Sequence, residues 1–136
     1  MLTYEKICDM FLTYRIKLKK ITEEINEYLL PYDISMQHAV YIMALSCYGD
    51  MTIKELNVNV DNDGAITTRV VKKLKKEGYV KKLGKTIKKY KISLTEKGHM
   101  PSKEILSAFN KAKKVHLGKL TQEDFVTLSM LADKLQ

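Results

Sequence analysis

The fold of this chain is decided by residues 52–98, which read TIKELNVNVDNDGAITTRVVKKLKKEGYVKKLGKTIKKYKISLTEKG. The stretch begins with Thr52 and Glu55 at the spacing of a capping box, in which each side chain satisfies a backbone amide at the start of a helix. We expect a short helix here. It should fray early, because residues 56–60 mix β-branched residues with Asn, and both are poor helix formers.

A second helix and a hairpin follow in the same stretch. The polar turn 61–63 offers an N-cap for a helix over 64–77, and Gly78 suits the left-handed position that ends a helix. The expected inward face of this helix is Ile66, Val70, Val71 and Leu74. Residues 79–83 and 90–94 are predicted as two antiparallel strands joined by a tip at 84–89. Two helices around a tight turn, followed by a two-stranded wing, predict a winged helix-turn-helix.

The positive charge of the chain is concentrated in this stretch. Residues 69–91 hold eleven basic residues and one acid, Glu77. Residues 54–97 hold thirteen bases and five acids, so this window carries the entire net charge of +8. A basic block beside helix and hairpin signals is typical of a protein that binds a phosphate backbone.

Helices are expected on both sides of this stretch. Thr3 can cap a long helix that runs until Pro31, and a second helix should follow Ser35 and close at Gly49. The residues expected to be buried in that second helix are Val40, Met43, Ala44 and Cys47. After Thr95 the helical pattern returns, with Pro101 near the start of one helix, and Thr121 caps the last helix. The fold class predicted is mainly α with a small β-hairpin wing.

Length and composition fit one globular domain. The chain has 136 residues, of which 45% are hydrophobic and 29% charged, and no apolar run approaches the ~18 residues of a membrane span. The first ten residues, MLTYEKICDM, lack the pattern of a secretory signal, so a cytoplasmic protein without membrane contact is expected. Two cysteines without a CxxC motif predict neither a disulfide framework nor a structural zinc site, and no cofactor is expected.

Three blocks carry a resemblance to a known family: TIKEL at 52–56, TRVVKKLKKEGYV at 68–80 and LTEKG at 94–98. Together they resemble the MarR family of transcription regulators. The resemblance implies a winged helix-turn-helix lobe over 35–99 and dimerisation helices over 1–34 and 100–136 in a single domain. It also implies a homodimer that binds double-stranded DNA at a pseudo-palindromic operator and acts as a repressor. The dimerisation contacts expected are Ile7, Phe11, Phe125, Leu128, Leu131 and Leu135.

Position in the lobe suggests which residues meet DNA. The early, outward part of the helix over 64–77 is expected to present Asp63, Gly64, Ala65, Thr67, Thr68, Arg69 and Lys72. Arg69 suits a guanine edge and Thr68 a thymine methyl group. Phosphate contacts are expected from Lys72, Lys73 and Lys76 of the helix and from Lys85, Thr86, Lys88 and Lys89 of the wing. The wing departs from the family pattern, because Thr86 and Lys88 stand where an Asp-x-Arg pair is usual.

Other functions have weaker support in the sequence. MarR-type proteins often respond to small aromatic ligands, and Tyr28, Tyr32, Tyr41 and Tyr48 could line such a site, although core packing is the simpler interpretation. Cys8 lacks the neighbours of the peroxide-sensing branch, since Asp9 and Leu12 occupy their places.

Neither a metal site nor an active site is evident. His38, His99 and His116 are expected on three different helices, and none has another histidine at the helical spacing of metal ligands. The sequence shows no recognisable set of catalytic residues, so the chain is not expected to be an enzyme. The alternative to a DNA regulator is a winged-helix module that binds a protein or RNA.

Overall fold

The computed structural model describes residues 1–84 and 90–136, which form six α-helices, a short 3-10 turn and a two-stranded sheet. The elements are α1 (Tyr4–Leu29), η1 (Leu30–Tyr32), α2 (Met36–Tyr48), α3 (Ile53–Val60), α4 (Gly64–Lys76), β1 (Val80–Leu83), β2 (Lys91–Leu94), α5 (His99–His116) and α6 (Gln122–Leu135). The predicted class, mainly α with a small β-hairpin wing, is confirmed. Among the described residues, no helix has both the length and the apolar character needed to cross a membrane.

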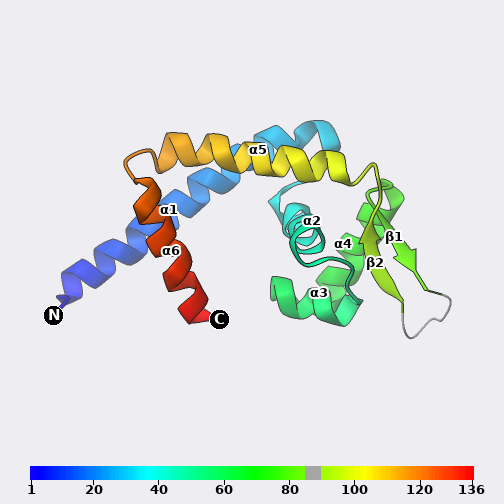
Figure 1. Ribbon diagram of the computed structural model, residues 1–136, viewed down its shortest axis with the longest axis horizontal. Coiled ribbons are helices and arrows are strands. Elements are labelled where there is room, and N and C mark those ends of the chain that lie inside the picture. The colour runs from blue at the N-terminus through cyan, green and yellow to red at the C-terminus, as the bar shows by residue number, and fades with distance from the viewer. Residues whose placement is uncertain (85–89) are drawn as a thin grey trace.

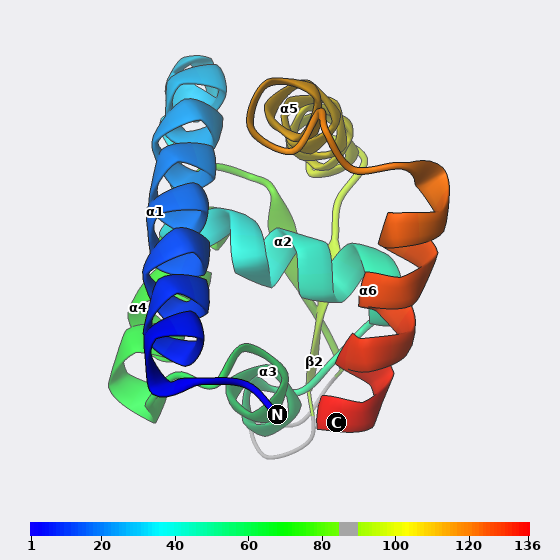
Figure 2. The same ribbon diagram turned by 90° about the vertical axis from the view of Figure 1, so that its left-hand side faces the viewer.

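Two long helices support a compact lobe at one end of the molecule (Figure 1). α1 and α5 pack against each other, and α2 lies against both of them. α3 lies beneath α2, and α4 and the hairpin complete the lobe beside it, whereas α6 descends from the far end of α5, away from the lobe (Figures 1 and 2). The predicted winged helix-turn-helix, α3–turn–α4 followed by β1 and β2, is therefore present.

Local signals set the helix starts. Thr3 Oγ1 accepts a hydrogen bond from the Lys6 amide at the start of α1, as predicted. At the start of α2, Ser35 and His38 form a capping box, in which His38 Nδ1 accepts from the Ser35 amide at 3.1 Å. His38 occupies the place that Glu or Gln usually takes in this motif.

The buried face of α2 differs from the prediction. Ala44 is buried as expected, but Val40 and Met43 are only half-buried, and Cys47 is exposed. The residues that α2 buries are Ala39, Tyr41, Ile42, Ala44 and Leu45. The buried face is rotated relative to the predicted one because α2 packs against α3 as well as against α1 and α5. These neighbours cover more than one side of the helix.

α3 is longer than its sequence suggests. The capping box of Thr52 and Glu55 is confirmed by hydrogen bonds of 3.1 Å in both directions. The expected early fraying is wrong, because the helix continues to Val60 and ends at Asp61 in the left-handed conformation. Burial of Leu56 against the core and the packing of α3 on α2 and α4 outweigh the poor intrinsic propensity of these residues.

The hairpin is joined to the helix-turn-helix by a backbone bridge. β1 and β2 are antiparallel, with Val80 opposite Leu94 and Leu83 opposite Lys91. Met51, just before α3, pairs with Ile92 of β2 through hydrogen bonds of 3.1 and 2.6 Å. Both side chains are buried. The wing base and the start of α3 therefore share one small sheet-like contact.

Candidate nucleic-acid interface

The outward face of α4 carries a row of exposed residues. Asp63 begins the helix, because its Oδ1 accepts a hydrogen bond from the Ile66 amide at 2.9 Å. Among the predicted contact residues along the helix, Gly64, Ala65, Thr68, Arg69, Lys72 and Lys76 are exposed. These residues were expected on the outer face of the lobe, and the structure places them there. Asp63 is exposed too, but its carboxylate serves the cap and puts a negative charge at the helix start, where a phosphate would otherwise be favoured.

Thr67 does not belong to this face. Its exposed fraction is 0%, and its Oγ1 lies 3.0 Å from the hydroxyl of the buried Tyr41. The prediction that Thr67 points outward is therefore wrong. The helical period explains the error, because Thr67 precedes Val70, Val71 and Leu74 by three, four and seven positions and shares their inward face. This spacing in the sequence could have identified it.

Lys73 is only partly available on the surface of α4. Its ammonium group lies 3.5 Å from the carboxylate of Asp33, in the turn between α1 and α2, and about a third of its side chain is exposed. A shallow depression at this edge of α4 is lined by Asp33, Arg69, Lys72, Lys73, Lys76 and Glu77. Four bases against two acids leave the depression positive, which suits an anionic backbone.

The LTEKG block fastens the end of α4 to the wing. Thr95 Oγ1 donates to the carbonyl of Gly78 at 2.5 Å, and the Thr95 amide donates to the carbonyl of Tyr79 at 3.0 Å. The Lys97 ammonium group donates to the carbonyl of Glu77 at 2.7 Å, and so satisfies a carbonyl at the C-terminal end of α4. The block therefore fixes the direction in which the chain leaves α4.

Gly98 completes this joint by allowing a close backbone approach. Its amide donates to Thr95 Oγ1 at 3.0 Å. A Cβ atom at this position would lie 2.1 Å from the carbonyl oxygen of Tyr79 and 3.2 Å from a methyl carbon of Leu94. The site has no room for any side chain.

Tyr79 links the same joint to the turn after α1. Its hydroxyl donates to the carbonyl of Tyr32 at 2.9 Å. Burial, and secondly the negative charge of Glu77, raise the pKa of Tyr79 above its ordinary value. The C-terminal end of α4 is therefore held from both the wing and the α1–α2 turn.

The wing is basic where the structure describes it. Lys81, Lys82 and Lys91 are exposed, and the Lys82 ammonium group lies 4.0 Å from the centre of the Tyr90 ring. The four wing residues predicted to contact phosphate, Lys85, Thr86, Lys88 and Lys89, lie outside the described residues.

Solved structures share this arrangement over nearly the whole chain. A MarR family protein from Bacillus stearothermophilus superimposes with a TM-score of 0.79 and 21% identity, covering 99% of this chain and 96% of that one. A mutant of MarR from E. coli complexed with operator DNA superimposes with a TM-score of 0.75 and 22% identity, covering 99% of both chains. The chain has the MarR fold. The resemblance that the three sequence blocks predicted is confirmed.

Sequence comparison agrees with the fold. The chain is 33% identical over 90 residues to the HTH-type transcriptional regulator SarZ of several Staphylococcus aureus strains. The match covers 65% of this chain, and the chain spans 60% of the length of these relatives. No family model matches the sequence.

The terminal helices of this MarR fold expose large apolar side chains. Of the six residues expected at a dimer interface, Ile7, Phe11, Leu128, Leu131 and Leu135 are exposed, Phe11 to 73%. Phe125 is half-buried, with the Lys113 ammonium group 4.1 Å from its ring centre. α6 buries none of its residues.

The tyrosines only partly form the cluster that was expected. Tyr41 is fully buried, and Tyr28 and Tyr32 pack against the core, so the core interpretation holds for these three. Tyr48 is 68% exposed, and its expected place in the cluster is wrong.

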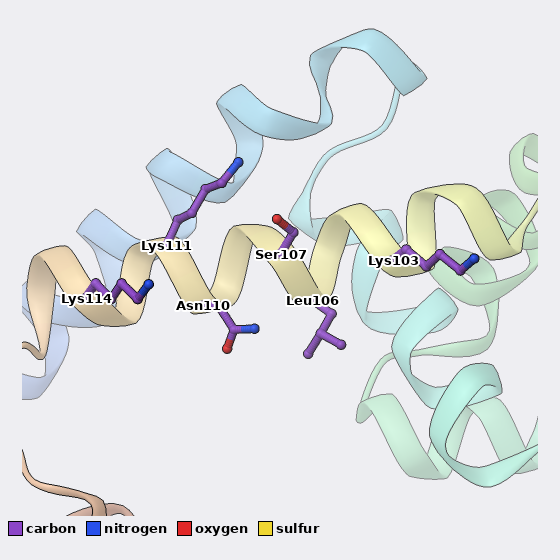
Figure 3. Close-up of a pocket in the computed structure, with 6 residues that line it drawn as sticks. All are labelled: Lys103, Leu106, Ser107, Asn110, Lys111 and Lys114. Carbon is purple, nitrogen blue, oxygen red and sulfur yellow. The ribbon is translucent and has the colours of Figure 1, made fainter.

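A second surface depression lies along α5. Figure 3 shows that Lys103, Leu106, Ser107, Asn110, Lys111 and Lys114 line it, all from α5. One helix alone supplies its lining, so it is an open surface rather than an enclosed aromatic site. A small aromatic ligand therefore stays a prediction.

The histidines and cysteines do not come together as a metal site in the part of the chain that the structure describes. His99 and His116 lie on the same helix, α5, so the expectation of three separate helices is wrong. His116 Nε2 lies 2.7 Å from a carboxylate oxygen of Glu24 and links α5 to α1. Cys8 is half-buried, and residues 1–84 and 90–136 contain no group of three or more potential metal ligands.

Proposed function

We propose that this protein is a sequence-specific double-stranded DNA-binding transcription regulator that inserts α4 into the major groove. The observation that carries the proposal is the division of α4 into two faces. Val70, Val71 and Leu74 pack inward, while Thr68 and Arg69 project outward from the first two turns, and their side chains form no hydrogen bond or ion pair within residues 1–84 and 90–136. This is the arrangement in which a recognition helix offers its N-terminal residues to base edges.

The outward residues divide into two roles. Arg69 carries a rigid fork of donors that matches the O6 and N7 acceptors of guanine, and Thr68 offers a methyl group for thymine. Lys72 and Lys76 lie farther along the same face and are suited to phosphates, where they orient the protein without specifying sequence. A MarR mutant with the same fold has been solved in complex with operator DNA, which supports DNA binding by a protein of this fold.

We infer further that the functional unit is a homodimer. α6 has 14 residues and buries none of them, and an isolated helix of that length is marginal in water. The exposed side chains Phe11 of α1 and Leu128 and Leu131 of α6 provide an apolar surface that a second copy would cover. Two-fold symmetry then requires matching half-sites about 10 base pairs apart, or a multiple of that spacing. A regulator bound across such a site acts as a repressor when the site overlaps a promoter.

The decisive experiment is DNA binding followed by fluorescence anisotropy across a salt series. The probes are a labelled duplex from upstream of the protein's own coding sequence, a duplex enriched by the protein from a random library, and a scrambled duplex. Tighter binding to the enriched duplex than to the scrambled one at ~150 mM salt, with a steep salt slope, would support the proposal. Equal affinity for all three, or a monomer in sedimentation analysis, would favour a module that binds a protein or RNA.

A further inference from the structure

The first two turns of α4 are anchored differently from the rest of the helix. Between Gly64 and Arg69 the only fully buried side chain is Thr67. Ile66 is partly buried against the core. The buried apolar anchors Val70, Val71 and Leu74 all lie farther along the helix. The part of α4 that presents Thr68 and Arg69 is thus held inward mainly through one polar residue.

That residue belongs to a small hydrogen-bonded cluster. The hydroxyl groups of Thr67 and Tyr41 lie 3.0 Å apart, and both side chains are fully buried. Asn62 Nδ2, in the turn between α3 and α4, donates to the Tyr41 hydroxyl at 2.9 Å. The Tyr41 oxygen therefore joins three elements at one point: α2, the turn and α4.

The cluster leaves few alternatives to its members. Within the described residues, the Thr67 hydroxyl has Tyr41 as its only side-chain partner, and water cannot reach it. A buried hydroxyl without a partner is costly, so the native geometry is strongly favoured over small rotations of α4. Hydrogen bonds are directional, whereas apolar contacts tolerate sliding.

We propose that Tyr41, Thr67 and Asn62 form a positioning cluster that sets the rotation and depth of the first turns of α4 and so sets the sequence preference of the protein. None of the three needs to touch DNA. Thr67 immediately precedes Thr68 and Arg69, so a rotation that breaks the Thr67 contact moves both side chains relative to the groove. Phosphate contacts by long lysine side chains adjust to such a shift, while a two-pronged Arg–guanine contact does not. This inference rests on the proposed DNA-binding function.

The test separates positioning from stability by removing the hydroxyl pair as a unit. Tyr41→Phe alone leaves the Thr67 hydroxyl buried without its partner and should lower the urea midpoint. Tyr41→Phe combined with Thr67→Val removes both hydroxyls with little change of shape. Because Asn62, which loses its acceptor, is only half-buried and can turn its amide to water, the midpoint should return close to that of wild type. The double variant keeps the Asp63 cap and the apolar contacts of α4 but loses the side-chain hydrogen bond that joins its first turns to α2.

Binding to the enriched and scrambled duplexes is then measured at fixed salt for wild type and the double variant. We expect affinity for the scrambled duplex within a factor of about two of wild type and a loss of about tenfold in discrimination, the scale of one good base contact. Faster amide hydrogen exchange at residues 64–69 should accompany this loss. Wild-type discrimination in a stably folded double variant would overturn the inference and leave the proposed function intact. Absence of discrimination in the wild type would overturn the proposed function itself.

A third variant keeps the test decisive if the double variant folds poorly. Asn62→Ala removes the tie to the turn and leaves the buried Tyr41–Thr67 pair in place. We expect a smaller loss of discrimination, about threefold, with an unchanged salt slope. Unchanged discrimination in Asn62→Ala, in the absence of a folded double variant, would overturn the role of the cluster.

Discussion

Replacing Gly98 with alanine should destabilise the protein through one close contact. The added Cβ would lie 2.1 Å from the carbonyl oxygen of Tyr79 and 3.2 Å from a methyl carbon of Leu94. Because carbon and oxygen atoms in ordinary contact lie more than 3 Å apart, the backbone would have to move by about 1 Å. That movement would stretch two of the hydrogen bonds that fasten α4 to the wing, from the Thr95 amide to Tyr79 and from the Gly98 amide to Thr95.

The expected cost follows from these contacts. Overpacking of this kind costs about 1–3 kcal/mol, and each weakened hydrogen bond adds roughly 0.5–1.5 kcal/mol. Summed over one close contact and two hydrogen bonds, we expect a loss of about 2–6 kcal/mol in the free energy of unfolding, which is a fall of roughly 7–20 °C in Tm for a domain of this size.

The assay is urea unfolding followed by far-ultraviolet circular dichroism at one fixed protein concentration, because dimerisation would make the midpoint depend on concentration. Gly64→Ala is the matched control. An added Cβ at Gly64 meets only Asn57 Nδ2 at 3.6 Å, an ordinary contact, and Gly64 lies within α4. Alanine there should leave stability unchanged or raise it by about 0.4–1 kcal/mol. Equal midpoints for Gly98→Ala and wild type would refute the close-contact argument.

Three further outcomes are expected. Burial, and secondly the charge of Lys73, lower the pKa of His38 from 6.5, so the unfolded chain takes up a proton before the folded one does. The free energy of unfolding should therefore be highest above about pH 6.5 and fall as the pH drops below that value. Protonation also removes the Nδ1 acceptor of the α2 capping box. His38→Gln retains an acceptor and should show a weaker decline in urea titrations between about pH 7.5 and 5. Arg69→Ala should lower the binding free energy for the enriched duplex by about 1–3 kcal/mol and for the scrambled duplex by much less. Lys72→Ala should weaken binding to both duplexes alike and reduce the salt slope by about 0.9. The same loss on both duplexes for Arg69→Ala would assign Arg69 to the phosphate backbone. Leu131→Glu places a charge on the exposed apolar face of α6 and should yield monomers in sedimentation analysis while the lobe stays folded. Dimers that persist in this variant would exclude α6 from the interface.

Sequence alone predicted the features that depend on neighbouring residues. The capping box of Thr52 and Glu55, the cap at Asp63 and the left-handed Gly78 each act within three or four positions along the chain, and all three are present. The order of helices and the hairpin followed from the same kind of signal. The caps join a side chain to a backbone amide three residues away, and Gly78 ends α4 through its own backbone conformation, so spacing is sufficient evidence in each case.

The errors arose where distant segments decide the outcome. The helical spacing of Thr67 places it on the buried face of α4, but what allows a polar side chain to stay there is Tyr41, 26 positions away, which supplies its hydrogen-bond partner. Lys73 forms an ion pair with Asp33, which lies in the turn between α1 and α2. Cys47 is exposed because the elements that pack against α2 cover other faces of that helix. The bridge between Met51 and Ile92 likewise joins segments whose separation no local pattern reveals.

The bridge between Met51 and Ile92 has a mechanical consequence. Its two backbone hydrogen bonds, one in each direction, make the wing base and the start of α3 a single stiff piece. A load applied to the wing is transmitted to α3 and, through the packing of α3 on α4, to α4. If, as proposed, two copies bind DNA together and must alter the distance between their α4 helices to match a bent or twisted duplex, each lobe moves as one rigid body. The bending would then fall to α1 and α5, with 26 and 18 residues, because helices of that length curve at low cost.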